Sequence, residues 1–193
     1  ILSLMVIMAV SLGISVCAEC EFQDVKEGSW FYDAVNVAVE AEVFNGTSKY
    51  EFSPHKPMTR EMFVTTLARL NKVDVSQYTS SSFSDVKVGE WYAPYVEWAY
   101  RKNITDGIGG GKFGVNKTIT RQEMVALFYK SAADFGENTE IPDQFKYDRS
   151  YDKGDVAEWA VDGMKWAQMV NMNKTFSQST ISLAKVQSTH QAT

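Results

Sequence analysis

Residues that carry catalytic chemistry are scarce in this sequence. The 193 residues include two histidines and two cysteines. His55 and His190 have no Ser, Cys or second His at a spacing typical of a nucleophile or a metal site. A metal centre built from His and Cys ligands is excluded by the same counts. The sequence therefore predicts a protein that is not an enzyme and that uses no metal or cofactor.

Proline and basic runs are scarce as well. With four Pro, 45% hydrophobic residues and 22% charged residues, the composition is that of a globular protein rather than a disordered or collagen-like one. Lys and Arg number 19 against 24 Asp and Glu, which leaves a formal net charge of -5. The chain thus lacks the basic footprint of a nucleic-acid-binding protein, and nucleic acid is not an expected partner.

Charge is absent from residues 1–18, which are apolar and carry small side chains at Val16 and Ala18, the two positions that a signal peptidase reads. The run is shorter than the roughly 20 apolar residues of a membrane-spanning helix, and acidic residues follow it closely. We interpret it as a secretory signal peptide, with a retained N-terminal anchor as the alternative. Residues 19–193 are then the mature domain. Cleavage leaves Cys20 without an intramolecular disulfide partner, and no stable membrane span is expected.

The chain repeats itself at a fixed offset. A shift of 61 positions superposes residues 22–70 on residues 83–131 without a gap. The shared residues are Asp24 and Asp85, Trp30 and Trp91, Gly46 and Gly107, Phe52 and Phe113, Thr59 and Thr120, and Arg60 and Arg121. A third copy at about 145–190 is degenerate, with Leu183 at the position of the two arginines. Self-similarity of this kind is typical of tandem structural units.

Each repeat has the pattern of two helices around a loop. Apolar residues at three- and four-residue steps predict one helix from about Trp30 to Glu42, which Asn45-Gly46 would end. Thr59 and its counterpart in the next repeat are expected to cap a second helix. Two such helices cannot bury both apolar faces alone, so the repeats must pack together. The sequence predicts an all-α fold.

Arginine follows the capping threonine in both intact repeats. A cation at a helix start is unfavourable by about 0.3–1 kcal/mol, so another interaction must favour Arg60 and Arg121 there. One interpretation is a structural ion pair with Asp24 or Asp85 of a neighbouring segment. The other is that the guanidinium and the free N–H groups of the helix start bind an anionic ligand. The two interpretations are compatible if the carboxylate orients the guanidinium.

Three further residue types have a structural and a functional interpretation. Glu123 completes a capping box with Thr120, and its expected role is structural. Five tryptophans recur at helical spacing and are expected mostly in the core, with one or two at a groove wall where an aromatic face suits a sugar ring. Gly46 and Gly107 are expected helix stops, although glycine also allows a ligand close to the backbone.

The repeated pattern resembles the S-layer homology (SLH) motif. The elements that carry the resemblance are Phe22-x-Asp24-Val25-x4-Trp30, Gly46, Phe52 and Met58-Thr59-Arg60-Glu61, and their counterparts from Phe83 to Glu123. The resemblance implies three motifs in a pseudo-threefold unit around a central three-helix bundle. The grooves between motifs would bind secondary cell-wall polysaccharide, often anionic and pyruvylated. This would anchor an exported protein to the wall of a Gram-positive bacterium as a cell-surface or S-layer protein.

The resemblance also implies the glycan-binding residues, which are Asp24, Trp30, Gly46, Thr59, Arg60, Asp85, Trp91, Gly107, Thr120 and Arg121. Because Leu183 replaces the third arginine, at most two grooves are expected to be competent, and the third repeat would close the bundle. Two alternatives stay open. The chain is the anchoring fragment of a larger wall-associated enzyme, such as a glycoside or peptidoglycan hydrolase, or it is a structural S-layer subunit.

Overall fold

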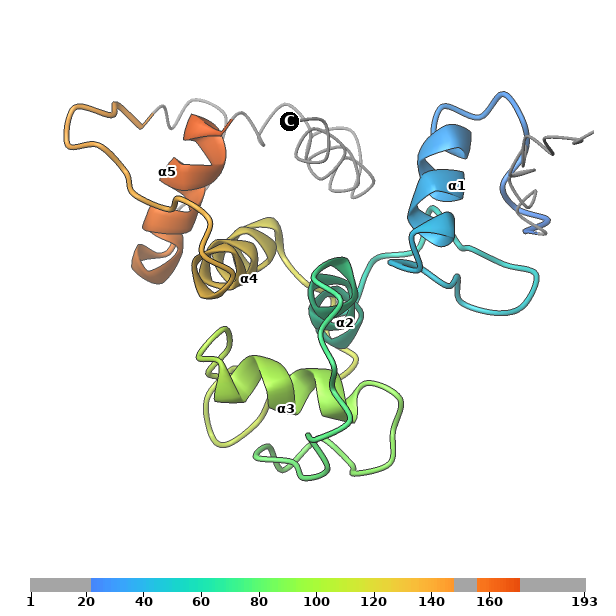
Figure 1. The fold of residues 1–193 in the computed structure, drawn as a ribbon, viewed down its shortest axis with the longest axis horizontal. Coiled ribbons are helices and arrows are strands. Elements are labelled where there is room, and N and C mark those ends of the chain that lie inside the picture. Colours follow the sequence, from blue (N-terminus) through green and yellow to red (C-terminus); the bar gives the residue numbers. More distant parts are fainter. Residues whose placement is uncertain (1–21, 148–155, 171–193) are drawn as a thin grey trace, which may run out of the picture.

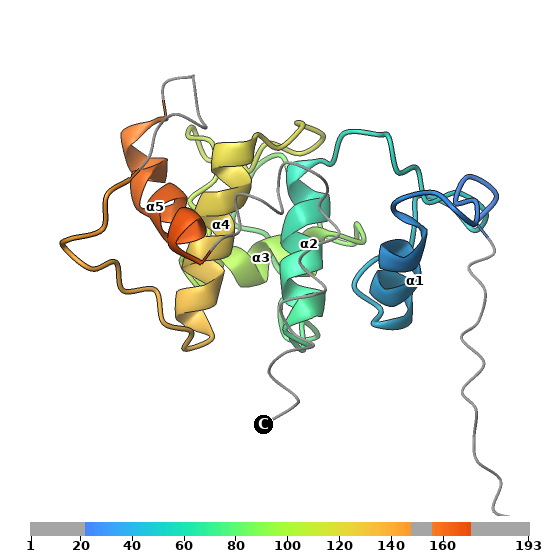
Figure 2. The same cartoon turned by 90° about the horizontal axis from the view of Figure 1, so that it is seen from above.

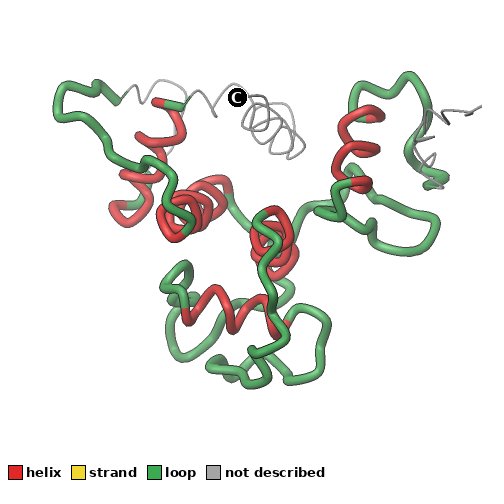
Figure 3. Tube along the Cα trace, in the orientation of Figure 1, coloured by secondary structure: helices red, strands yellow, loops and turns green. Residues whose placement is uncertain are grey.

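The computed structural model describes residues 22–147 and 156–170. The predicted signal peptide, both cysteines and the Leu183 segment of the third repeat lie outside these residues. Within them the chain is helical and contains no strand, which confirms the all-α class (Figure 3). The elements in chain order are α1 (Tyr32–Glu40), α2 (Arg60–Leu70), α3 (Ala93–Arg101), α4 (Arg121–Asp134), the 3-10 helix η2 (Glu158–Ala160) and α5 (Val161–Met169).

The first helix of each repeat is shorter than predicted. α1 begins at Tyr32 with Phe31 as its N-cap and ends at Glu40, so Asn45-Gly46 does not end it. Glu42 has a φ of 57°, and Asn103 has a φ of 55° at the same place after α3. These two residues adopt the left-handed conformation that was expected of the glycines. The helix therefore ends earlier, and Gly46 lies in the loop that follows.

The second helix of each repeat begins as predicted. Thr59 and Thr120 are the N-caps of α2 and α4 and have extended backbone. The capping box at α4 is confirmed, because Thr120 Oγ1 accepts from Glu123 N and Glu123 Oε2 accepts from Thr120 N at 2.8 Å. α2 has Met62 at the corresponding position and makes no side-chain capping bond. Thr59 thus keeps its hydroxyl out of the helix cap.

The first helix of each later repeat packs on the second helix of the repeat before it. α3 of repeat two packs on α2 of repeat one, α5 packs on α4, and α2 contacts α4 (Figure 2). Trp98 and Trp166 lie in the main core between these helices, as predicted for tryptophans at helical spacing. α1 has its own small core with Val25, Phe31 and Val35 and contacts none of the other described helices (Figure 1). The pseudo-threefold arrangement stays a prediction.

A buried carboxylate fixes the connector between the first two repeats. Glu97 of α3 is 2% exposed, and its Oε2 accepts from Ser82 N at 2.8 Å. Its Oε1 accepts from Ser82 Oγ at 3.1 Å and from Arg101 Nε at 2.8 Å. Burial alone would raise the pKa of Glu97, but the bonds from Arg101 and Ser82 outweigh it and hold the pKa below the ordinary value of 4.5.

The lowered pKa of Glu97 predicts a loss of stability in acid. Since the folded pKa lies below 4.5, this contribution to the free energy of unfolding is complete above pH 4.5 and disappears as the pH falls through the folded value. We expect Glu97→Gln to lose about 1–3 kcal/mol at pH 7 and to flatten the acid side of the stability profile. Urea denaturation between pH 3 and 7 measures both effects. Glu137→Gln, at an exposed position, is the control, and a profile of Glu97→Gln that matches it would contradict the prediction.

Candidate functional site

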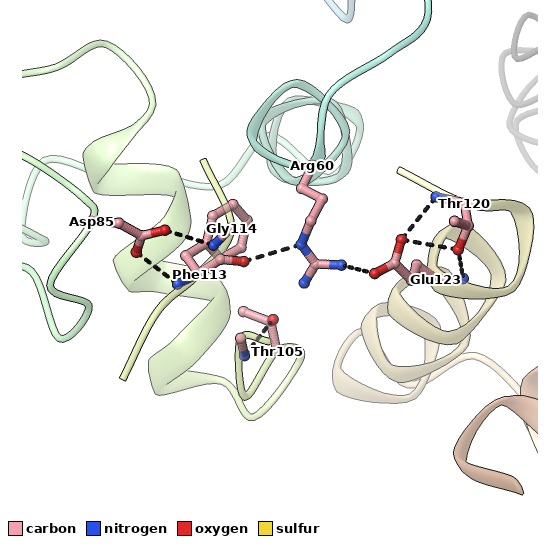
Figure 4. Close-up of polar contacts among 8 residues, drawn as sticks. Arg60, Asp85, Thr105, Phe113, Gly114, Thr120 and Glu123 are labelled. Carbon is pink, nitrogen blue, oxygen red and sulfur yellow. Dashed lines mark hydrogen bonds and ion pairs between the residues drawn. The ribbon is translucent and has the colours of Figure 1, made fainter. Parts of the chain in front are cut away.

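The loop between the two helices of each repeat is held by an aspartate near the start of that repeat. Asp85 Oδ1 accepts from Phe113 N at 2.7 Å, and Oδ2 accepts from Gly114 N at 2.8 Å and from Val115 N at 3.2 Å (Figure 4). Asp24 does the same in repeat one, where it accepts from Phe52 N at 2.8 Å and from the next N–H at 2.7 Å. Both aspartates thus bind backbone of their own repeat.

These bonds set the charge state of the two aspartates. Partial burial by itself raises the pKa of Asp24 and Asp85, but the N–H donors of the loops outweigh it and hold each pKa below the ordinary value of 3.8. Both carboxylates are therefore ionised at neutral pH. Their geometry gives each one a structural role in shaping the loop.

Arg60 links the two repeats. Its side chain lies between the repeat-two loop and the start of α4, where Nε donates to Phe113 O at 3.1 Å and Nη1 donates to Glu123 Oε1 at 2.8 Å (Figure 4). The guanidinium carbon also lies 5.2 Å from the centroid of the Phe113 ring. Arg60 is 4% exposed. One interpretation of Arg60 was an ion pair with Asp24 or Asp85. The structure shows an ion pair with Glu123 instead, because both aspartates bind loop N–H groups and Glu123 extends from the facing helix.

The two motif glycines are required by close packing of the loops. Gly46 has a φ of 73°, and a Cβ there would lie 2.6 Å from the Phe22 ring and 2.7 Å from Glu51 O. Gly107 has a φ of 77°, and a Cβ there would lie 2.7 Å from the Phe83 ring and still closer to Lys112 O. No L side chain fits either place without displacing the backbone. The glycines therefore serve the loop and not the helix end.

A groove of about 850 Å³ runs along α2, between this helix and the α1 half of repeat one. Its lining includes four of the predicted glycan-binding residues, Trp30, Gly46, Thr59 and Trp91. Trp30 and Trp91 are 68% and 53% exposed, so each offers a ring to solvent. We call this cavity the repeat-one groove. The other predicted residues, Asp24, Arg60, Asp85, Gly107, Thr120 and Arg121, do not line it.

The charged lining of the repeat-one groove consists of Lys56 and Arg69, and no Asp or Glu is among its described lining residues. Arg69 lies 5.7 Å from the Tyr95 ring at the start of α3. Neither cation stands out in the sequence pattern. A basic residue in the last turn of a helix is ordinary, because it is favourable at the negative end of the helix dipole. Only the tertiary arrangement shows that Arg69 faces a groove.

The groove also contains hydroxyl groups without a partner in the described structure. Thr59 Oγ1 and Thr65 Oγ1 are buried and make no hydrogen bond, and Thr65 is 3% exposed. Both residues line the groove. A buried hydroxyl without a partner is costly, which favours a ligand or a water molecule bound there. Two exposed indoles, two cations and these hydroxyls together suit a polar, anionic ligand with apolar ring faces.

The described residues contain neither a metal-binding cluster nor a membrane-spanning helix. Among residues 22–147 and 156–170, no group of three or more His, Cys, Asp or Glu is arranged to hold a metal ion. None of the helices in these ranges is both long enough and apolar enough to cross a membrane.

The fold and the groove define a tandem helical repeat protein with an aromatic, cationic cleft. Comparison with protein families identifies the repeats: residues 21–61 and 82–125 match the S-layer homology domain. These segments are the two intact copies that the sequence pattern predicts. The third, degenerate copy stays a prediction.

Several known proteins are similar to this chain. Amylopullulanase of Thermoanaerobacterium thermosulfurigenes is 32% identical over 142 residues, which are 72% of this chain and 7% of that protein. The surface-layer 125 kDa protein of Lysinibacillus sphaericus is 30% identical over 128 residues, 63% of this chain and 10% of that protein. The cellulosome-anchoring protein of Acetivibrio thermocellus is 29% identical over 114 residues, 57% of this chain and 25% of that protein.

The chain thus spans between 7% and 25% of the length of these relatives. In the enzyme among them the similar segment is a small part, which agrees with a module that is not itself catalytic. The family match and the surface-layer and anchoring relatives indicate a secreted protein located at the cell wall or cell surface.

Proposed function

We propose that this chain is a non-covalent anchor that binds secondary cell-wall polysaccharide in the repeat-one groove and so holds an exported protein on the bacterial wall. The observation that carries the proposal is the groove itself, with exposed Trp30 and Trp91 beside Lys56 and Arg69. The apolar face of an indole suits the C–H face of a sugar ring. The two cations suit an acidic substituent such as a pyruvyl ketal.

The proposal also accounts for the overall charge. The chain carries a net charge of -5, so attraction for an anionic glycan must come from a local concentration of donors. Arg60 contributes little to it, because its Nε and Nη1 are bound to Phe113 O and Glu123 Oε1. Lys56 and Arg69 take that role in the described groove. For Arg121, which begins α4, a glycan-binding role stays a prediction.

The expected result for Trp91→Ala is at least tenfold weaker binding to purified Gram-positive cell walls. The variant loses the stacking of a sugar ring on an exposed indole, whereas its fold is not disturbed. Co-sedimentation with the walls measures binding, and circular dichroism checks the helices. Walls stripped of their secondary polysaccharide should bind neither the wild-type chain nor the Trp91→Ala variant. Trp159→Ala is the matched control, since Trp159 occupies the equivalent position of repeat three, is 60% exposed and does not line this groove. Equal binding by both variants would count against the proposal.

A second candidate follows from the comparisons. Because the chain spans a small part of each relative, it is consistent with the anchoring segment of a larger wall-associated enzyme or with a segment of a structural S-layer subunit. The same groove would serve either protein. Extension of the reading frame beyond Thr193 into a hydrolase domain would support the first, and self-assembly into a lattice would support the second.

The remaining proposals concern the ends of the chain. We infer that residues 1–18 direct export and are removed, and that residues 19–193 form one SLH unit whose third repeat closes a central bundle. N-terminal sequencing of the protein recovered from cell walls tests the first inference. Leu183→Ala tests the second, because it should lower the free energy of unfolding more than it lowers wall binding.

A further inference from the structure

The two intact repeats differ at the positions that line the repeat-one groove. A shift of 61 positions places each lining residue of repeat one on its counterpart in repeat two. The cations keep their charge, since Lys56 corresponds to Lys117 and Arg69 to Lys130. Two neutral residues become acidic, since Asn45 corresponds to Asp106 and Met62 to Glu123. The counterpart of the groove thus carries two carboxylates that the repeat-one groove lacks.

Both carboxylates of repeat two lie beside cations. Lys130 Nζ lies 3.2 Å from Asp106 Oδ2, and Glu123 binds Arg60 at 2.8 Å. Lys130 and Arg60 are therefore each paired with an acid of the protein. In repeat one the partner of Arg69 is neutral: when the Asn45 amide nitrogen donates to Phe44 O at 3.1 Å, its oxygen accepts from Arg69 Nη1 at 3.3 Å. Asn45 orients this guanidinium without cancelling its charge.

The hydroxyl groups of the groove also differ between the two repeats. Thr59 Oγ1 and Thr65 Oγ1 in the repeat-one groove have no partner. Their counterparts cannot serve a ligand in the same way, because Thr120 Oγ1 is bonded within the capping box and Ala126 replaces the second threonine. Hydroxyl groups without a partner in repeat one are thus bonded or missing in repeat two.

The geometry points to one competent site among these two repeats. We infer that the repeat-one groove alone binds the acidic glycan with high affinity, and that neutral Asn45 and Met62, where repeat two carries Asp106 and Glu123, determine this selectivity. The inference rests on the proposed function and deepens it. An acid at position 45 would lie in contact with Arg69, and a unit charge at that distance is enough to offset the attraction for an anionic substituent.

The decisive variant is Asn45→Asp, which changes one amide to a carboxylate of the same shape. The probe is the acidic polysaccharide released from purified Gram-positive cell walls, and isothermal titration measures affinity and stoichiometry. We expect the wild-type chain to bind one site equivalent and Asn45→Asp to bind about tenfold more weakly. The loss should shrink at high salt, because screening weakens the added repulsion.

Two controls separate local from general charge effects. Asn138→Asp adds the same charge outside the groove and should bind like the wild type within about twofold. Asp106→Asn, the reciprocal exchange in repeat two, should also leave affinity and stoichiometry unchanged, because the Glu123 carboxylate remains in the repeat-two counterpart of the groove, where it binds Arg60. If Asn45→Asp loses its helical circular dichroism, Arg69→Gln tests the same charge from the side of the cation and is expected to weaken binding equally.

The outcomes distinguish the inference from the proposed function. If the wild-type chain does not bind the polysaccharide, the proposed function fails and the inference fails with it. If the wild type binds but Asn45→Asp binds equally well, or if the two repeats bind two equivalents, the inference is wrong and the proposed function stands. Loss of wild-type binding after the carboxyl groups of the polysaccharide are reduced to alcohols would support the acidic ligand that the inference requires.

Discussion

Arg60→Met is expected to lower the free energy of unfolding by about 3 kcal/mol, because it leaves the Glu123 carboxylate and Phe113 O without the donor that joins the two repeats. Methionine keeps the apolar stem that packs on the Phe113 ring, so the loss reports on the hydrogen bonds and the charge. Urea denaturation monitored by circular dichroism at pH 7 measures the change.

The partner and an exposed ion pair provide the controls for Arg60→Met. Glu123→Gln keeps an oxygen for the capping box but removes the charge, and the double variant should show a coupling energy of about 1–3 kcal/mol. Lys102→Met breaks an ion pair with Asp134 in which the lysine side chain is 44% exposed, and it should cost less than about 1 kcal/mol. If Arg60→Met costs no more than Lys102→Met, Arg60 does not hold the repeats together.

Gly107→Ala is expected to be comparably damaging, with a loss of about 2–5 kcal/mol. Its φ of 77° costs an L residue about 1–2 kcal/mol. The added methyl group would also press on Lys112 O and lie 2.7 Å from the Phe83 ring, and overpacking of this kind costs about 1–3 kcal/mol. Thermal and urea denaturation both measure the loss.

A neighbouring glycine separates the two costs. Gly110 has a φ of 61°, and a Cβ there meets no atom within 4 Å. Gly110→Ala should therefore lose only the conformational part, about 1–2 kcal/mol. Similar losses for the two variants would show that close packing of the loop on Phe83 is not the reason for glycine at position 107.

Local pattern and periodicity predicted much of the fold. The starts of α2 and α4 at Thr59 and Thr120 were readable because a capping residue acts on its own helix within one turn. The burial of Trp98 was readable because a buried helical face repeats every three or four residues. The end of α1 was not, since Glu42 adopts a left-handed conformation that glycine or asparagine more often supplies.

The candidate site, like the fold, could be predicted only in part from the sequence. The fixed offset of 61 positions drew attention to the paired Asp, Trp, Gly and Thr-Arg residues, and four of these do line the groove. The contacts of each residue could not be predicted from the sequence pattern. Asp85 was a candidate ion-pair partner of Arg60, yet in the structure it binds loop N–H groups, and the arginine binds a glutamate 63 residues away.

The sequence by itself determined that this protein contains tandem helical repeats, two of which match the S-layer homology domain, because repetition, helix caps and apolar periodicity act over a few residues and survive in the one-dimensional pattern. Only the tertiary structure decided which arginine is used for cohesion and which lines the repeat-one groove. Arg60 and Arg69 lie in the same helix, but packing of repeat two against repeat one buries Arg60 on Glu123 and leaves Arg69 in the groove beside neutral Asn45. That division depends on how the repeats meet, which no single repeat encodes.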